Sequence, residues 1–232
     1  MVYIGVIGDF NSDHYTHLAI NDSFNHLKSA INTSINFEWV HTSLLRENLQ
    51  GIIKRFNGIW MASGTPYTNT NGAIGVLKHA RENDIPLLAI CGGFQYMIIE
   101  YARNVLGIDN AEHEETTPDA DNLIIKSLSC SLIGQSEELK IVDKDSITYR
   151  AIGNENFVGS YHCNFGLNPR FKKIIDEGGL KVVIENENGE VRGCELKNRK
   201  FFVGSLFQPQ LHSTKDNPNP LLISFVKSII NN

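Results

Sequence analysis

Hydrophobic residues along the first 110 positions alternate between two spacings. Short apolar runs, typical of buried strands, are separated by longer stretches in which apolar residues recur every three or four positions, as on one face of a helix. The run "VYIGVIG" opens this pattern, and "INFEWV", "GIWMAS" and "IPLLAI" repeat it. Alternating strands and helices with short connections predict a parallel sheet that carries helices on both faces.

The predicted helices fill the intervals between these strands. They cover approximately residues 14–30, 73–83 and 93–108. We expect the last of them to close at Gly107, because glycine favours the left-handed conformation that ends many helices.

After residue 110 the pattern changes. An acidic, turn-forming loop "EHEETTPDADN" is followed by interrupted strands, a hairpin that turns at Asn188-Gly189, the apolar strand "FFVGSLF" and a closing helix with Pro220 in its first turn. We therefore predict one α/β domain over residues 1–232, with a flavodoxin-like, mostly parallel sheet and an antiparallel addition in the second half.

Composition narrows the class of protein. The chain has 232 residues, is 41% hydrophobic and carries a net charge of −5, and no run of lysine and arginine exceeds two residues, which argues against a nucleic-acid partner. The N-terminal "MVYIGVIGDF" has the pattern of a first strand rather than of a signal peptide, and no apolar run approaches the roughly 20 residues that span a bilayer. We expect a cytoplasmic protein without a membrane partner.

The cysteines and acidic residues give no metal-binding pattern. Four cysteines at positions 91, 130, 163 and 194 show no C-x-x-C spacing, which argues against a zinc site and against a disulfide framework. The run "EHEE" lacks the paired histidine or cysteine spacing of a metal site. We expect no metal and no cofactor.

One cysteine lies at a turn from a strand into a helix. In "IPLLAICGGFQYMII" a buried strand leads into Cys91, and Gly92 and Gly93 permit a tight turn. Such a turn points the thiol out of the carboxyl edge of the sheet and places it at the positive end of a helix, where we expect a lowered thiol pKa. Backbone N–H groups of the turn, and of Gly64 in the loop "ASGTPYTNTNG", are candidate donors to an oxyanion. The structural alternatives are a small buried residue at an ordinary turn and an ordinary loop around Gly64.

These residues resemble a known family. The stretch "AICGGFQYMIIEYARNVLGIDNAEHEE" is similar to the nucleophile region of the class I glutamine amidotransferase domain of CTP synthase, which typically reads G-[IV]-C-L-G-M-Q, then an E-[FY]-A-R-[NH]-V helix and an N-A-N-S-T-E loop. Similar stretches at the start, middle and end extend the resemblance over nearly the whole chain. It does not include the synthetase half of that family, and no G-x-x-x-x-G-K-[ST] occurs, so we do not expect this chain alone to make CTP.

The resemblance implies roles for five residues. Cys91 matches the nucleophile that attacks the glutamine side-chain amide, forms a γ-glutamyl thioester and releases ammonia. Gly64 and the N–H of Gly92 match the oxyanion hole. Glu115 matches the carboxylate that holds the substrate α-ammonium. Gln95 is a further residue that we expect to bind the substrate.

Two family motifs depart from the pattern. The family's F-H-P-E supplies the histidine and glutamate of the triad, but residues 207–210 read "FQPQ", which places the neutral amides Gln208 and Gln210 at those positions. In R-H-R-Y-E-V-N-P the family has an arginine that grips the substrate α-carboxylate, and Asn164 stands there in "HCNFGLNP". General acid–base catalysis typically contributes about 10²–10⁴-fold, so we expect weak or lost glutaminase activity.

Three histidines are candidates for a replacement base, although each has a structural or solvated alternative. His162 shares strand parity with Asn164, which makes it the candidate that geometry favours. His212 follows the degenerate motif by two residues, and His113 lies near Glu115.

Three interpretations of the site remain open. In the first, Cys91, assisted by His162, acts through a thioester on an amide, ester or glutamine-derived small molecule without a free α-carboxylate. In the second, the protein is a non-catalytic pseudo-amidotransferase that binds a metabolite or partner. In the third, Cys91 is a redox-active thiol, as Cys163 on a matched active-site strand suggests. The candidate partners are a small-molecule substrate and a separate ammonia-accepting protein, and a homodimer is the candidate assembly.

Overall fold

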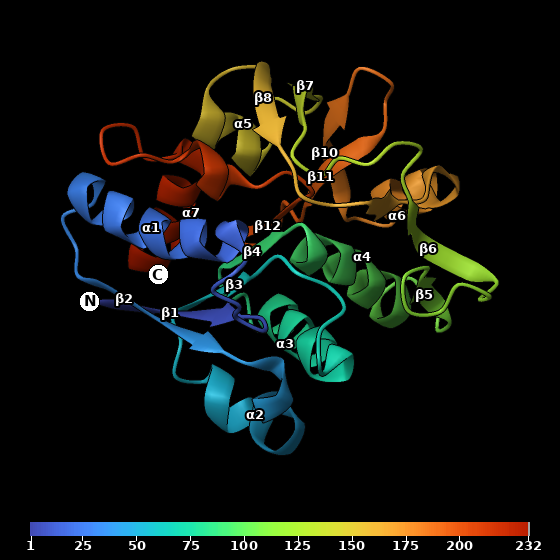
Figure 1. The fold of residues 1–232 in the computed structure, drawn as a ribbon, viewed down its shortest axis with the longest axis horizontal. Coiled ribbons are helices and arrows are strands. Elements are labelled where there is room, and N and C mark those ends of the chain that lie inside the picture. The colour runs from blue at the N-terminus through green and yellow to red at the C-terminus, as the bar shows by residue number, and fades with distance from the viewer. Residues whose placement is uncertain (232) are drawn as a thin grey trace.

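Five parallel strands form one half of the main sheet in a computed structural model that describes residues 1–231 (Figure 1). In spatial order they are β2 (Ile35–Val40), β1 (Val2–Ile7), β3 (Gly58–Met61), β4 (Leu87–Ile90) and β12 (Phe202–Ser205). This succession of strands is that of flavodoxin-like folds, in which ligands bind at the carboxyl edge of the sheet. The predicted fold class is confirmed.

The other half of the main sheet is antiparallel, as the sequence predicts. It continues from β12 through β11 (Val191–Glu195), β10 (Lys181–Asn186), β7 (Ser136–Ile141) and β8 (Asn156–Ser160). The hairpin between β10 and β11 turns at Gly189, whose φ of 72° is a conformation that favours glycine.

A second sheet has three strands. It consists of β5 (Ala111–His113), β6 (Asn122–Ser127) and β9 (Phe165–Leu167). The predicted acidic loop therefore begins within a strand. The reason is that His113 is buried, although the acidic composition of the segment predicts that its residues are exposed to solvent.

Seven α-helices complete the described chain: α1 (Tyr15–Ala30), α2 (Leu45–Ile53), α3 (Thr70–Glu82), α4 (Gly92–Asn104), α5 (Ile147–Ile152), α6 (Lys172–Glu177) and α7 (Pro220–Ile230). Successive residues of β3 point to opposite faces of the sheet. Trp60 packs against Phe24 of α1 and Phe225 of α7, whereas Met61 adjoins Gly93 of α4. The sheet thus carries helices on both faces, with α1 and α7 together on one of them (Figure 1).

Gly107 closes helix α4 as predicted. The regular helix ends at Asn104, a few residues before the predicted end. Gly107 has a φ of 69°, and the N–H of Ile108 donates to the carbonyl of Ala102 at 2.9 Å. A bond of this reach around a left-handed glycine satisfies carbonyl groups that a helix end leaves free.

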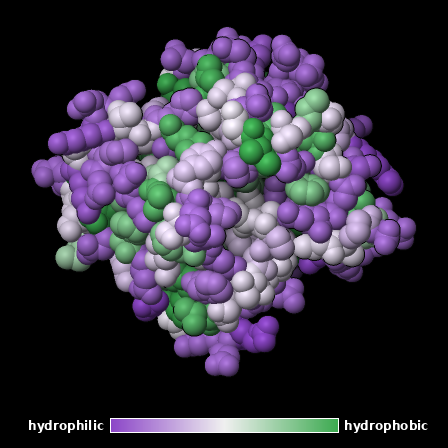
Figure 2. Space-filling model, viewed as in Figure 1, coloured by the Kyte–Doolittle hydropathy of each residue, from purple (hydrophilic) through white to green (hydrophobic). Residues whose placement is uncertain are grey.

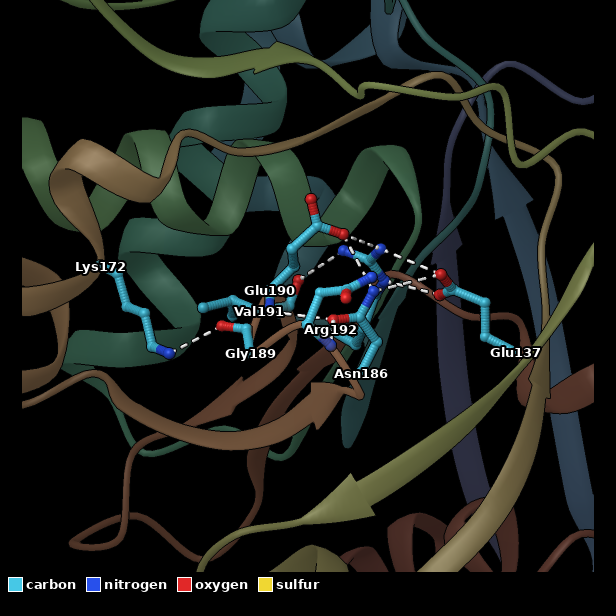
Figure 3. A network of polar contacts seen from close by, with 8 residues as sticks. Glu137, Lys172, Asn186, Gly189, Glu190, Val191 and Arg192 are labelled. Atoms are coloured by element: carbon cyan, nitrogen blue, oxygen red, sulfur yellow. Dashed lines mark hydrogen bonds and ion pairs between the residues drawn. The ribbon is translucent and has the colours of Figure 1, made fainter.

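A buried ion-pair network joins β7 to the hairpin of β10 and β11. The Arg192 side chain is 3% exposed, and its guanidinium donates to Glu137 at 2.8 Å and to Glu190 at 2.7 Å (Figure 3). The Asn186 amide donates to the same two carboxylates. A buried charge needs such partners, because an unpaired one is strongly destabilising.

No helix within residues 1–231 has both the length and the hydrophobicity needed to cross a membrane. On the face drawn in Figure 2, hydrophobic residues lie in small separate groups between hydrophilic ones. The large aromatic side chains Trp60, Phe24 and Phe225 are fully buried.

Close packing of α4 on β3 gives a test of the fold. A Cβ at Gly93 would lie 2.5 Å from the Met61 carbonyl oxygen and 2.7 Å from its Cβ, so the backbone would have to move. We expect Gly93→Ala to lower the free energy of unfolding by about 1–3 kcal/mol, as overpacking usually does. Urea denaturation followed by circular dichroism measures this change.

The matched control is Gly75→Ala in α3. Its Cβ would meet Leu49 Cδ1 at 2.7 Å, the mobile end of a flexible side chain. Alanine in a helix is favoured over glycine by roughly 0.5–1 kcal/mol, so this variant should be no less stable than the wild type. Equal stability of both variants would contradict a tight contact between α4 and β3.

Candidate active site

Cys91 occupies a strained turn between β4 and α4. Its φ is 53° and its ψ is −108°, a region that costs a non-glycine residue about 1–3 kcal/mol. Its N–H donates to the carbonyl of Ser205 in β12 at 2.8 Å, and its carbonyl accepts from the N–H of Gln95 at 3.0 Å. Strand and helix together therefore hold Cys91 in place.

The thiol of Cys91 faces a cavity of about 190 Å³. The cavity lies where β3 and β4 end, since its lining includes the residues that follow each strand. Six residues predicted for the site line it: Gly64, Cys91, Gln95, Glu115, His162 and Asn164. Gly92 adjoins the cavity, because a Cβ there would collide with Thr65 Cγ2, and Thr65 belongs to the lining.

His113 is a structural residue behind the cavity rather than a base. Its Nδ1 accepts the N–H of Glu115 at 3.1 Å, so the ring proton resides on Nε2 and is donated to Gln95 Oε1 at 3.0 Å. The Gln95 amide in turn donates to the carbonyl of Phe165 at 2.8 Å. Burial lowers the pKa of His113 to about 4 and keeps the ring neutral. This chain of bonds joins α4, β5 and β9 around the cavity.

His17 supports the glycine loop opposite Cys91, a role that the sequence did not reveal. Its Nδ1 accepts the N–H of Asn11 at 3.0 Å, so its Nε2–H donates to the carbonyl of Ser63 at 2.9 Å. This bond fixes the peptide before Gly64, whose φ of 99° favours glycine. Burial lowers the pKa of His17 and favours the neutral ring that this arrangement requires. The available signal was its place on the buried face of α1, three residues before Ile20.

Among the three candidate bases, His162 lies in the cavity lining. Its Nδ1 is 3.3 Å from the hydroxyl of Tyr15, and burial, followed by the neighbouring His14 ring, lowers its pKa. The Cys91 thiol donates to the backbone carbonyl of His162 at 3.7 Å rather than to the ring. His212 is exposed and bonded to Ser160 Oγ at 2.7 Å, and it does not belong to this lining.

The parity argument that favoured His162 was wrong. Residues 161–164 form a connection between β8 and β9, not a strand, so alternation of side chains does not apply. Cys163 is likewise outside a strand. The connection is placed by nonlocal bonds, among them the Leu128 N–H to the Asn164 carbonyl at 2.8 Å. His14 and Thr16 from the start of α1 and Ile133 also line the cavity and were not predicted.

Comparison with known proteins identifies the family. Residues 16–228 match the family Glutamine amidotransferase class-I. The chain belongs to this family. Relatives named CTP synthase include one from Saccharolobus solfataricus, 29% identical over 98% of this chain, and one from Porphyromonas gingivalis, 31% identical over 99%. The chain spans less than half of each, 45% and 44%.

Solved amidotransferase structures share the fold. The CTPS glutaminase domain of Trypanosoma brucei with bound acivicin superposes with a TM-score of 0.91 at 21% identity, covering 100% of this chain and 95% of that one. A glutamine amidotransferase from Thermotoga maritima gives a TM-score of 0.65 at 12% identity, covering 100% and 99%. The resemblance inferred from the sequence is thus confirmed at the level of family and fold.

In this member of the family, Gln208 and Gln210 form a buried amide pair. They are 0% and 2% exposed, and Gln210 Nε2 donates to Gln208 Oε1 at 2.7 Å. Gln208 Nε2 and Gln210 Oε1 find no hydrogen-bond partner among residues 1–231. An amide neither accepts nor releases a proton at neutral pH, so the pair is bonded side chain to side chain but offers no acid–base chemistry.

The charges around the cavity are unbalanced. Within residues 1–231, Glu115 is the one carboxylate of the lining, and no lysine or arginine lines it. Arg192 acts electrostatically on Cys163, but its guanidinium is bound to Glu137 and Glu190 (Figure 3). A ligand carboxylate would therefore meet no free cation of the lining.

The neutral state of His113 predicts a dependence of stability on pH. Its folded pKa of about 4 lies below the usual 6.5, so below pH 6.5 the unfolded chain binds a proton that the folded chain does not. The free energy of unfolding should therefore fall as the pH drops from about 6.5 towards 4, by about 3 kcal/mol from this residue. His113→Asn should flatten that part of the curve.

Urea denaturation of both proteins at pH values between about 7 and 4.5 measures the two slopes. The slope, not the absolute stability, is the readout, since the variant also loses hydrogen bonds. Parallel curves would contradict a buried, neutral His113.

Proposed function

We propose that this chain is a cysteine-dependent hydrolase or transferase of the class I amidotransferase type. Its substrate would be an amide, ester or glutamine-derived small molecule without a free α-carboxylate, and turnover of free glutamine would be weak or absent. The observation that carries the proposal is the cavity in front of Cys91. Within residues 1–231, its lining contains one carboxylate and neither lysine nor arginine.

The charge of the lining argues against free glutamine as the preferred substrate. Glutamine is a zwitterion, and Glu115 complements its ammonium group only. Asn164 offers its carboxylate a neutral amide, which lacks the positive charge and the paired N–H donors of an arginine. An amine-bearing amide or ester leaves no carboxylate without a partner and fits this lining better.

The proposed chemistry begins at the Cys91 sulfur. Sulfur attacks the carbonyl carbon while the thiol proton passes to His162, and the backbone N–H groups of Gly64 and Gly92 would stabilise the resulting oxyanion. The leaving amine or alcohol takes the proton back, and water or another acceptor then resolves the thioester. In the tautomer whose Nδ1–H donates to the Tyr15 hydroxyl, His162 Nε2 is free to accept that proton.

A primary amide substrate would release ammonia. The relatives named CTP synthase extend over about twice the length of this chain, which accounts for 44–45% of them. We propose an ammonia-accepting protein as the partner in that case. A cytoplasmic location belongs to the same proposal.

Restoring the missing groups tests this function. We expect the triple variant Gln208→His, Gln210→Glu, Asn164→Arg to release ammonia from glutamine at least about 10²-fold faster than the wild type, because it regains acid–base catalysis and a carboxylate clamp. Addition of Cys91→Ala to the triple variant should abolish the gain. The rate is measured with a coupled glutamate dehydrogenase assay.

The wild type and its Cys91→Ala variant are the controls. Ammonia release by the wild type that matches the triple variant and disappears in Cys91→Ala would overturn the proposal. A folded triple variant with no gain would also contradict it, because the cavity would then lack more than these three groups.

A further inference from the structure

The cavity contains a second thiol that neither the hydrolytic proposal nor the family assignment uses. Cys163 and Cys91 both line it. The Cys91 thiol also lies 3.7 Å from the carbonyl oxygen of His162, the residue before Cys163. Two cysteines 72 positions apart in the sequence thus line the same cavity.

We propose that Cys91 and Cys163 form a disulfide modification site that hydrogen peroxide or an organic hydroperoxide closes and a thiol reductant reopens. In this state Cys91 is withdrawn from nucleophilic chemistry without irreversible oxidation. The proposal goes beyond the hydrolytic function and does not depend on it.

Access distinguishes this pair from the other cysteines. The cavity opens to solvent, because Glu115, Asn164 and His14 in its lining are exposed, so a small peroxide can enter. Cys130 is exposed, and Cys194 is fully buried in β11, and neither lines the cavity. Within residues 1–231, Cys91 and Cys163 are the cysteines of this lining.

The backbone also suits the reaction. Cys91 is held by two backbone hydrogen bonds at its turn, whereas Cys163 lies in the connection between β8 and β9. The Cys163 carbonyl accepts the N–H of Leu132 at 3.1 Å, but Cys163 belongs to no strand pairing that its movement would break. A disulfide tolerates only a narrow range of geometries, so a partner that can adjust matters.

The two sulfurs have different roles. Hydrogen bonding to Cys91, followed by burial, raises the pKa of the Cys163 thiol, so Cys163 stays protonated. The Cys91 sulfur attacks a peroxide oxygen, the O–O bond breaks, and water or an alcohol leaves to give a sulfenic acid. The Cys163 sulfur then attacks the Cys91 sulfur, the S–O bond breaks, and the oxygen leaves as water with the Cys163 proton. Two thiols are oxidised to one disulfide while the peroxide is reduced.

Peptide mapping tests the site. The wild type is treated with one equivalent of hydrogen peroxide, blocked with iodoacetamide and digested without reduction, and the peptides are identified by mass spectrometry. The expected result is a linked pair of peptides that contain Cys91 and Cys163 and that separate on treatment with dithiothreitol. The matched control Cys130→Ser should form the same link.

Cys163→Ser should form no link, and with an excess of hydrogen peroxide its Cys91 should accumulate as sulfinic and sulfonic acid. Wild-type Cys91 that goes to those acids without a link, that links to Cys130 or that stays unmodified would overturn the proposal. The wild-type map decides even if Cys163→Ser fails to fold. Because linkage needs no turnover, its failure is distinct from a failure of the proposed hydrolytic function.

Discussion

The backbone of Cys91 sits at a positive φ, held between the carbonyl of Ser205 and the first turn of α4, and the candidate site is built around this turn. The strain of about 1–3 kcal/mol persists only because neighbouring packing determines it. Gly93 allows α4 to approach β3 closely enough for the turn to form, and Gly92 leaves room for Thr65. Without these contacts the sulfur would not face the cavity.

Buried neutral histidines extend the same constraint to the cavity walls. His17 anchors the peptide before Gly64, and His113 joins Gln95 to the backbone of Glu115. Each donates from Nε2 because its Nδ1 accepts a backbone N–H, so protonation of either ring at Nδ1 would break the bond that this nitrogen accepts. The walls are thus rigid, while the groups of the degenerate motif, Gln208 and Gln210, are inert in proton transfer. The site thus combines a pre-organised nucleophile with the lack of a cation that could bind a substrate carboxylate, and the proposed substrate class fits this combination.

The sequence predicted what depends on local pattern. The parallel strands, the closing glycine at position 107 and the hairpin at Gly189 follow from periodicity and backbone preference, and all are present. It also placed Gly64 and Cys91 in one cavity, because the ends of adjacent parallel strands meet at one sheet edge. The resemblance to the family supplied Gln95, Glu115 and Asn164, which line the same cavity.

What the sequence did not predict depends on distant contacts. Helix α5 has only six residues, and the buried carboxylate of Glu195, about 50 positions away, accepts the N–H groups of Ile147 and Thr148 at its start. Helix α2 is interrupted at Asn48, whose φ of −146° is not helical. The connection that carries His162 was treated as a strand. It is instead held by hydrogen bonds from the Leu128 N–H and from the Cys91 thiol, and such distant contacts leave no periodic pattern in the sequence.

The central claim is that Cys91 forms a thioester with an amide that bears an amine but no carboxylate. Intact-mass spectrometry of acid-quenched protein tests it most directly, with glutaminamide and glutamine as paired probes that differ in the α-carboxylate. The account predicts an acyl adduct with glutaminamide, absent from Cys91→Ala, and little or none with glutamine. An adduct that forms as readily with glutamine, or none with either probe, would contradict it.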